Sequence, residues 1–211
     1  MGTIGYGSMY PASNPANVLM VVQSTVSLVL TALATGLVFA KFSRPTARVM
    51  FSRNVSLAPM NGVPTLSFRI GNQRKNSIVE AQVRVALSYS ERTLEGKDFF
   101  RTVDLKLRRD RLQLSRSWNV LHTVDETSPL FGRTPEELVE DGAEIFVSVV
   151  GLDDIWMQTV HATHRYAATQ IAWGYRLADV LTDHGHLLIL DLTKFHDLER
   201  AEPGPGFPYP S

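Results

Sequence analysis

The chain has 211 residues, of which 44% are hydrophobic and 20% are charged, and its formal net charge at pH 7 is zero. It contains no cysteine, which excludes disulfide frameworks and zinc sites built from thiolates. The length allows one domain of ordinary size with an appended segment. The charges are unevenly placed, because no Asp, Glu, Lys or Arg precedes Lys41.

Near its N-terminus the chain has an expected loop that contains two glycines, TIGYGSMYP, at residues 3–11. Two glycines on either side of an aromatic residue also occur in ordinary turns. The alternative is that the backbone of this loop is itself a functional surface, since glycine allows conformations that a Cβ disfavours. The stretch alone does not decide between these two interpretations.

An uncharged apolar run follows the loop, at residues 16–40. It exceeds the roughly 20 residues with which an α-helix crosses a hydrocarbon core, so we expect a transmembrane helix over residues 12–43. A signal peptide would carry its positive charges before the apolar run, whereas here they follow it. These basic residues predict that the rest of the chain lies in the cytoplasm. A buried core helix is the competing interpretation.

A linker at residues 44–53, which contains Pro45, is expected to end the helix. Residues 54–200 then show short β-branched runs and period-two alternation, as in TLSFRI and IVEAQVRVALSY, separated by turn-forming residues. This pattern predicts a mainly-β domain with the architecture of an immunoglobulin-like β-sandwich.

The sequence predicts the structure of two further segments in this part of the chain. A short helix is expected at TPEELVE, where Thr134 and Glu137 can form a capping box and Pro135 suits the first turn. Residues 201–211 are rich in proline and glycine, so they are expected to form a disordered tail.

Taken together, the glycine loop, the spanning helix and the β-sandwich resemble the inward-rectifier potassium channels, most closely their bacterial members. TIGYG is similar to the selectivity filter of that family, and VVQSTVSLVL and GLVFAKFSRP are similar to its pore-lining inner helix and the exit from it. GNQRKNSIVEAQVR, HTVDETSPLFG and WGYRL are similar to successive landmarks of its cytoplasmic domain. The resemblance runs from Thr3 to about Glu199. It implies a homotetramer in the inner cell membrane, with the C-terminal domain in the cytoplasm.

In this family four filter loops meet on one axis, and their carbonyl oxygens replace the water around a K⁺ ion. The resemblance therefore implies K⁺ as the permeant ion and no other metal or cofactor. It also implies a channel of the voltage-gated class. The residues that it places in the filter are Thr3, Ile4, Gly5, Tyr6 and Gly7.

The resemblance assigns three further positions to the ion path. Thr31 falls where many members carry an acidic or amide residue that attracts cytoplasmic polyamines or Mg²⁺, so strong block at that site is not expected. Phe39 falls at the crossing of the inner helices, where bulky apolar side chains close the pore; packing or contact with lipid is its alternative role. Glu80 matches an acidic residue that lines the cytoplasmic pore, and a solvated strand residue is the alternative. Val150 replaces a second acidic residue of that pore.

Basic residues near the membrane match positions that contact anionic phosphoinositide headgroups in eukaryotic relatives. Thr46 and Ala47 occupy two places where those relatives carry basic residues, which argues against activation by phosphoinositides at high affinity. The alternative is that the charges only set the membrane topology. The matching positions are Lys41, Arg44, Arg48, Arg74 and Lys75.

The resemblance begins at the filter, whereas the subunits of the family carry an outer helix and a pore helix before it. We therefore expect an N-terminally truncated subunit that does not conduct selectively by itself. The alternative function is a non-conducting, membrane-anchored β-sandwich that binds or assembles with complete channel subunits.

The histidines are the residues that could suggest an enzyme as an alternative function. His161 and His164 are three residues apart in a β-rich region, which directs their side chains to opposite faces. His184 and His186 lie in an expected turn. Phosphate loops, nucleophile elbows and paired-carboxylate signatures are absent from the sequence. We expect neither enzymatic activity nor a nucleic-acid partner.

Overall fold

The computed structural model describes residues 10–42, 48–74, 76–183 and 188–202. It divides the chain into two compact units, Met1–Thr46 and Ala47–Ser211, and each is described by itself. The second unit is called the β-domain below.

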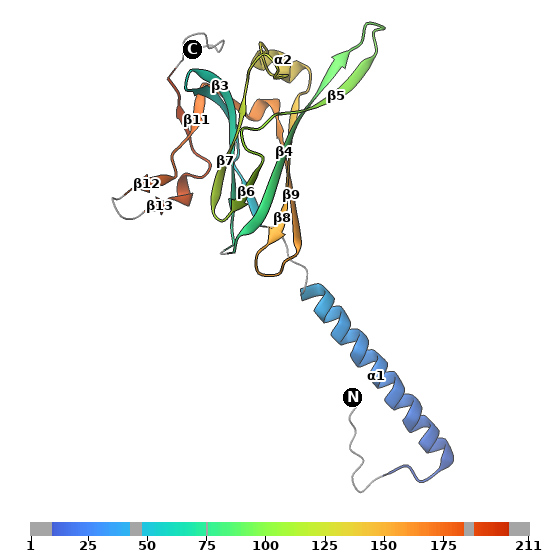
Figure 1. Ribbon diagram of the computed structural model, residues 1–211. Coiled ribbons are helices and arrows are strands. Elements are labelled where there is room, and N and C mark those ends of the chain that lie inside the picture. Colours follow the sequence, from blue (N-terminus) through green and yellow to red (C-terminus); the bar gives the residue numbers. More distant parts are fainter. Residues whose placement is uncertain (1–9, 43–47, 75, 184–187, 203–211) are drawn as a thin grey trace. The chain divides into compact units, whose positions relative to one another are not determined.

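The first unit contains one long helix, α1 (Asn14–Phe42), shown in blue in Figure 1. Its 29 residues correspond to about 43 Å at 1.5 Å per residue, which exceeds the ~30 Å hydrocarbon core of a bilayer. Residues Asn14–Lys41 have a mean hydropathy of 1.9 and bury nothing within the structure. Length and composition therefore allow α1 to span a membrane.

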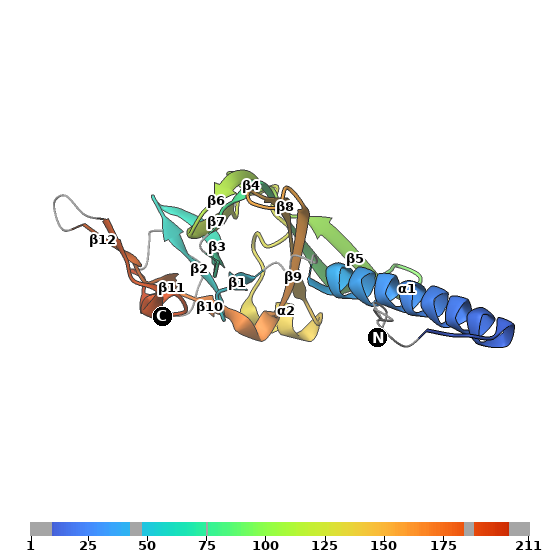
Figure 2. The ribbon, with the colours of Figure 1, turned by 90° about the horizontal axis from the view of Figure 1, so that it is seen from below.

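The β-domain contains two five-stranded sheets (Figures 1 and 2). The first has the order β1-β3-β2-β10, with β7 also paired to β3, and the second has the order β5-β4-β8-β9, with β6 also paired to β4. Strands of the first sheet are β1 (Val49–Phe51), β2 (Val55–Met60), β3 (Val63–Asn72), β7 (Ser117–Thr123) and β10 (Ile171–Trp173). Strands of the second are β4 (Ile78–Arg92), β5 (Asp98–Asp104), β6 (Arg111–Leu114), β8 (Glu144–Asp153) and β9 (Thr159–Ala167).

One hydrophobic core lies between the two sheets, as the alternation predicts. In β8, residues Ile145, Val147 and Val149 are buried, while the residues between them are exposed or half-buried. Leu57, Leu66 and other apolar residues of the first sheet belong to the same cluster. The expected mainly-β sandwich is confirmed. The strand β1 begins inside the expected linker, because its three residues pair with the end of β3.

The remaining elements are short. α2 (Pro135–Glu140) begins after Thr134, whose side chain accepts a hydrogen bond from the amide of Glu137 at 3.2 Å, and Glu137 accepts one from the amide of Thr134 at 3.0 Å. The expected capping box is confirmed. After β10 come two small antiparallel pairs, β11 (Tyr175–Leu177) with β14 (Leu198–Arg200), and β12 (Leu181–Asp183) with β13 (Leu188–Leu190). Two 3₁₀ turns lie at Ala168–Gln170 and Leu192–Lys194.

Two buried polar side chains connect the layers of the β-domain. Tyr166 on β9 donates a hydrogen bond to the carbonyl of Ser52, next to β1, at 2.9 Å, and burial raises the pKa of the Tyr166 hydroxyl to about 12. Arg69 on β3 is 1% exposed and donates to the carbonyls of Ala178 at 2.7 Å and Phe195 at 3.2 Å. Arg69 thus attaches the C-terminal segment to the first sheet.

Candidate functional site

The expected pore residues fall partly on α1. The five residues of the expected filter lie outside the described residues. Thr31 lies within α1 and its hydroxyl donates to the carbonyl of Ser27 at 2.8 Å, which satisfies this polar group within an apolar helix. Phe39 lies eight residues later, about 12 Å along the helix axis, and is 72% exposed. Within its own unit Phe39 is therefore free to contact lipid or another protein surface.

Glu80 lies on β4 at an irregular point of the second sheet. Its side chain is exposed and its φ is 50°, in the left-handed region that disfavours residues other than glycine. The pairing of β4 with β8 and with β6 shifts register at this point, so Glu80 belongs to a β-bulge. The bulge directs Glu80 to the outer face of the sheet, away from the core.

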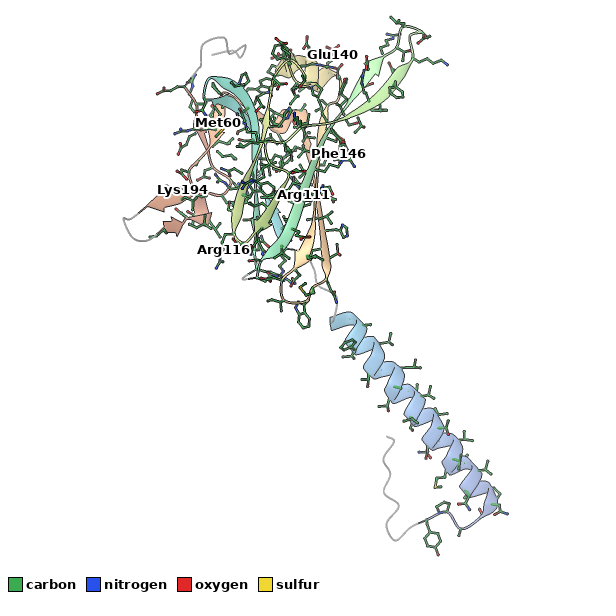
Figure 3. The ribbon with its side chains drawn as sticks, viewed as in Figure 1. Met60, Arg111, Arg116, Glu140, Phe146 and Lys194 are labelled. Atoms are coloured by element: carbon green, nitrogen blue, oxygen red, sulfur yellow. The ribbon has the colours of Figure 1, made fainter. Side chains whose placement is uncertain are left out.

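The outer face carrying Glu80 also holds apolar residues, Val150 and Phe146 among them, and a paired arginine and aspartate. Gln82 is opposite Val150, which is opposite His161. Arg84 makes a bidentate hydrogen-bonded pair with Asp104, at 3.1 and 2.7 Å. A shallow hollow of about 360 Å³ lies beside this pair, and its lining includes Arg84, Ala86, Thr102, Asp104, Phe146, Ser148 and Thr163. Phe146 is marked in Figure 3, on β8.

Two of the five expected lipid-contacting residues come together at one edge of the β-domain. The amide of Gln73 donates to the carbonyl of Arg48 at 3.0 Å, so Arg48 lies beside the loop that carries Arg74. Lys41 lies near the end of α1, in the other unit. The remaining two, Arg44 and Lys75, lie outside the described residues.

A buried carboxylate that sequence reasoning missed organises the same edge. Asp153 is 2% exposed and accepts a hydrogen bond from the Nδ2 of Asn76 at 2.6 Å. It also accepts from the amides of Ile155 and Trp156, both at 3.0 Å, which fixes the turn between β8 and β9. Asp153 thereby connects this turn to the loop of Arg74. The sequence DD before IW is a turn signal, but it does not say which aspartate is buried.

The two described histidines that could suggest a metal site point to opposite faces of β9, as expected. His161 is exposed on the outer face, whereas the ring of His164 stacks on Phe51 with their centroids 4.9 Å apart. Among the residues that the structure describes, no cluster of three or more His, Cys, Asp or Glu could hold a metal ion. His184 and His186 lie outside those residues.

A further buried histidine, His122 on β7, was not predicted. Its Nδ1 lies 2.8 Å from the carbonyl oxygen of Lys106, and its Nε2 lies 2.8 Å from the Oγ of Ser128. A carbonyl only accepts, so Nδ1 carries the proton of the neutral ring, and Nε2 accepts from Ser128. Burial lowers the pKa of His122, and the bond to Lys106 and the charge of Asp125 offset this in part.

This pKa shift predicts that the β-domain loses stability in acid. The folded state binds the His122 proton more weakly than the unfolded chain, whose histidines titrate near ~6.5. The contribution is therefore complete above that pH and declines below it, by at most about 1.4 kcal/mol per pH unit for one proton. Denaturant unfolding of the full chain in detergent micelles, followed by tryptophan fluorescence between pH 5 and 8, measures this slope.

His164 and His196 also have lowered pKa values, so they add to the slope with the same sign. The variant His122→Asn separates the contributions, because it keeps a polar side chain that does not titrate. We expect a shallower dependence of stability on pH in this variant. An unchanged slope would assign the effect to the other histidines.

Comparisons with known proteins match the sequence of the β-domain and of most of the chain. Residues 49–206 match the family model described as the inward rectifier potassium channel C-terminal domain. The chain is 39% identical over 200 residues to the inward rectifier potassium channel Kirbac3.1 of Paramagnetospirillum magnetotacticum, covering 94% of this chain and 68% of that protein. It is 36% identical over 206 residues to the ATP-sensitive inward rectifier potassium channel 12 of Mus musculus and of Homo sapiens, covering 92% of this chain in both.

The matches differ in how much of each relative the chain covers. A 200-residue match to a chain of 211 residues extends beyond the family model and includes most of α1. The chain spans 68% of the bacterial relative but about half the length of the mammalian ones, 48% in Mus musculus and 47% in Homo sapiens.

Proposed function

The chain belongs to the inward rectifier potassium channel family, and we propose that it is a subunit of a tetrameric membrane channel that conducts K⁺. The observation that carries this proposal is the 39% identity to a bacterial channel across the spanning helix as well as the β-domain. The family is one of ion channels rather than enzymes. Its description refers to inward rectification, and voltage gating has no support from the comparisons.

In this proposal the α1 helices of four subunits line the pore, and the β-domains continue it in the cytoplasm. Thr3–Gly7 form the filter, Thr31 faces the cavity, Phe39 narrows the pore, and Glu80 lines its cytoplasmic part. Regulation by anionic membrane lipids is supported by the position of Arg48 beside the loop of Arg74, since basic residues next to a membrane attract anionic headgroups.

A chimera tests the proposal. The present chain replaces the matching 200 residues of Kirbac3.1, and the purified protein is placed in liposomes loaded with K⁺ or Na⁺. We expect K⁺ flux well above Na⁺ flux. A chimera that inserts and assembles but conducts neither ion would favour the alternative of a non-conducting, membrane-anchored partner of complete subunits. Suppression of Kirbac3.1 flux when this chain is co-expressed with it would then support that alternative.

Replacing Phe39 with alanine should raise the open probability of the chimera. Four bulky apolar side chains at one level exclude water from a narrow pore, and removing them wets it, so an increase of roughly severalfold is expected. Single-channel recording in planar bilayers measures this change.

Leu37→Ala is the matched control, since Leu37 is 71% exposed on the same helix and two residues away. It points in a different direction around the axis, because successive residues are 100° apart. Its open probability should stay at the parent value. An equal increase in both variants, or none in Phe39→Ala, would remove Phe39 from the constriction.

A further inference from the structure

The bulge at Glu80 has two residues on β4 opposite one on β8. Val79 is opposite Leu152 and Gln82 is opposite Val150, so Glu80 and Ala81 share the single residue between them, Gly151. Ile78 and Ala81 are both buried, which regular alternation over three residues does not allow. The extra residue thus restores the inward alternation and leaves Glu80 on the outer face.

Gly151 has the close approach that the bulge requires. A Cβ at this position would lie 2.5 Å from the Cγ2 of Ile78. It would also lie 3.1 Å from the Cα of Ala81 and 3.1 Å from the carbonyl oxygen of Val79. Since these atoms flank Glu80 on both sides, a side chain at residue 151 would displace the backbone of the bulge.

The side chain at residue 80 is unusual for its backbone. A φ of 50° favours glycine, asparagine or aspartate, and glutamate there carries conformational strain. Glutamate is strained at this φ and its carboxylate is exposed. This indicates that the carboxylate, rather than the backbone conformation of the bulge, accounts for a glutamate at residue 80. Glu80 also makes no ion pair with any described residue, whereas Asp104 on the same face is neutralised by Arg84.

We infer that Gly151 is a positioning residue for Glu80: the packing of β4 against this glycine fixes where the carboxylate stands and so sets its attraction for cations. The inference rests on the proposed role of Glu80 in the cytoplasmic pore. Four carboxylates at one level focus their field on a multivalent cation, and the focus depends on their distance from the axis. The pair of Arg84 and Asp104 contributes little to that field because its charges cancel within each subunit.

Block of the chimera by Mg²⁺ on the cytoplasmic side tests this inference. Glu80→Gln should weaken the block, by roughly tenfold for the loss of four charges at one level. Gly151→Ala should weaken it in the same direction by displacing the carboxylate. In the Glu80→Gln background, Gly151→Ala should add nothing, because no carboxylate remains to be displaced.

Moving the carboxylate provides a sharper control. Gln82 is exposed on the same face, two residues on and outside the bulge, so the double variant Glu80→Gln/Gln82→Glu should recover part of the block. Gly151→Ala should leave that recovered block unchanged. A second control is Gly71→Ala on β3 of the first sheet, where a Cβ would lie 2.7 Å from the Cε2 of Phe195. It disturbs packing to a similar degree and should leave Mg²⁺ block as it is.

The outcomes separate the inference from its premise. Unchanged block in Glu80→Gln would overturn the pore-lining role of Glu80, and the inference with it. Weaker block in Glu80→Gln but unchanged block in Gly151→Ala, or an equal effect of Gly151→Ala on the relocated carboxylate, would overturn the positioning role alone. If Gly151→Ala does not assemble, the double variant Gly151→Ala/Ile78→Ala replaces it, because it removes the nearest obstructing atom. We expect this double variant to assemble and to be blocked by Mg²⁺ more nearly as the parent is than Glu80→Gln. Block as weak as in Glu80→Gln would count against the inference.

Discussion

Replacing Arg69 with methionine should lower the free energy of unfolding of the β-domain by about 3–5 kcal/mol. The guanidinium donates to Asn119 Oδ1 at 2.8 Å as well as to the carbonyls of Ala178 and Phe195. Methionine fits an apolar space of similar length but leaves these acceptors without a donor in a buried place. Burial lowers the pKa of Arg69 and Asp179 opposes this, yet an arginine stays protonated in proteins, so the charge is present to be lost.

Tryptophan fluorescence during denaturant unfolding of the full chain in detergent measures this loss. All three tryptophans, Trp118, Trp156 and Trp173, belong to the β-domain, so the signal reports on it and not on α1. Arg69→Lys should keep the charge but lose the fork of donors, and we expect an intermediate loss. Arg84→Met is the matched control, because Arg84 is an exposed arginine on a strand and its ion pair is open to solvent.

The control should unfold at nearly the same denaturant concentration as the parent chain. An equal loss in both variants would show that apolar substitution on any strand, rather than the network of Arg69, is responsible. A loss confined to Arg69→Met with an unchanged dependence on denaturant would assign the effect to the folded state.

The burial of Arg69 shows a contact that hydrophobic alternation does not predict. TLSFRI alternates in hydrophobicity, which predicts Leu66, Phe68 and Ile70 inward and Arg69 in solvent. The first three are buried, but residues 65 and 69 are buried too, and Arg69 is covered by the segment that contains Ala178 and Phe195. Alternation reports whether one face is apolar, and it carries no information on a covering segment more than 100 residues away.

The bulge at Glu80 was missed for a related reason. IVEAQVRVALSY was predicted as one strand, and β4 does run from Ile78 to Arg92 without interruption. Strict alternation, however, places Ile78 and Ala81 on opposite faces, whereas both are buried. The signal that could have indicated the bulge is a glycine within a strand pattern, Gly151 in VVGLD, but pairing it with Glu80 requires the register between β4 and β8.

Local chemistry was easier to predict than long-range contact. The capping box at Thr134 depends on residues three apart, and the opposite directions of His161 and His164 depend on a strand period of two. The family resemblance assigned roles to residues whose function depends on four subunits around an axis. Capping motifs and strand alternation do not assign such roles. Those roles remain proposals for Thr31, Phe39 and Glu80.

Replacing Gly5 with alanine in the chimera should abolish selective K⁺ conduction. In the proposed filter, carbonyl oxygens of successive residues point at one ion, which requires backbone conformations that a Cβ opposes at the glycines. Carbonyls displaced by a fraction of an ångström no longer match a dehydrated K⁺, so the ratio of K⁺ to Na⁺ flux should fall to about one, or flux should cease. Parallel flux assays in liposomes loaded with either ion measure both outcomes.

Gly36→Ala provides the control, because Gly36 lies in α1 and a Cβ there would meet no atom within 4 Å in this unit. That variant should keep the parent ratio, so a defect specific to Gly5 cannot come from glycine replacement in general. Selective flux that survives Gly5→Ala would mean that other oxygens replace the water around the ion, and the assignment of residues 3–7 to the filter would be wrong.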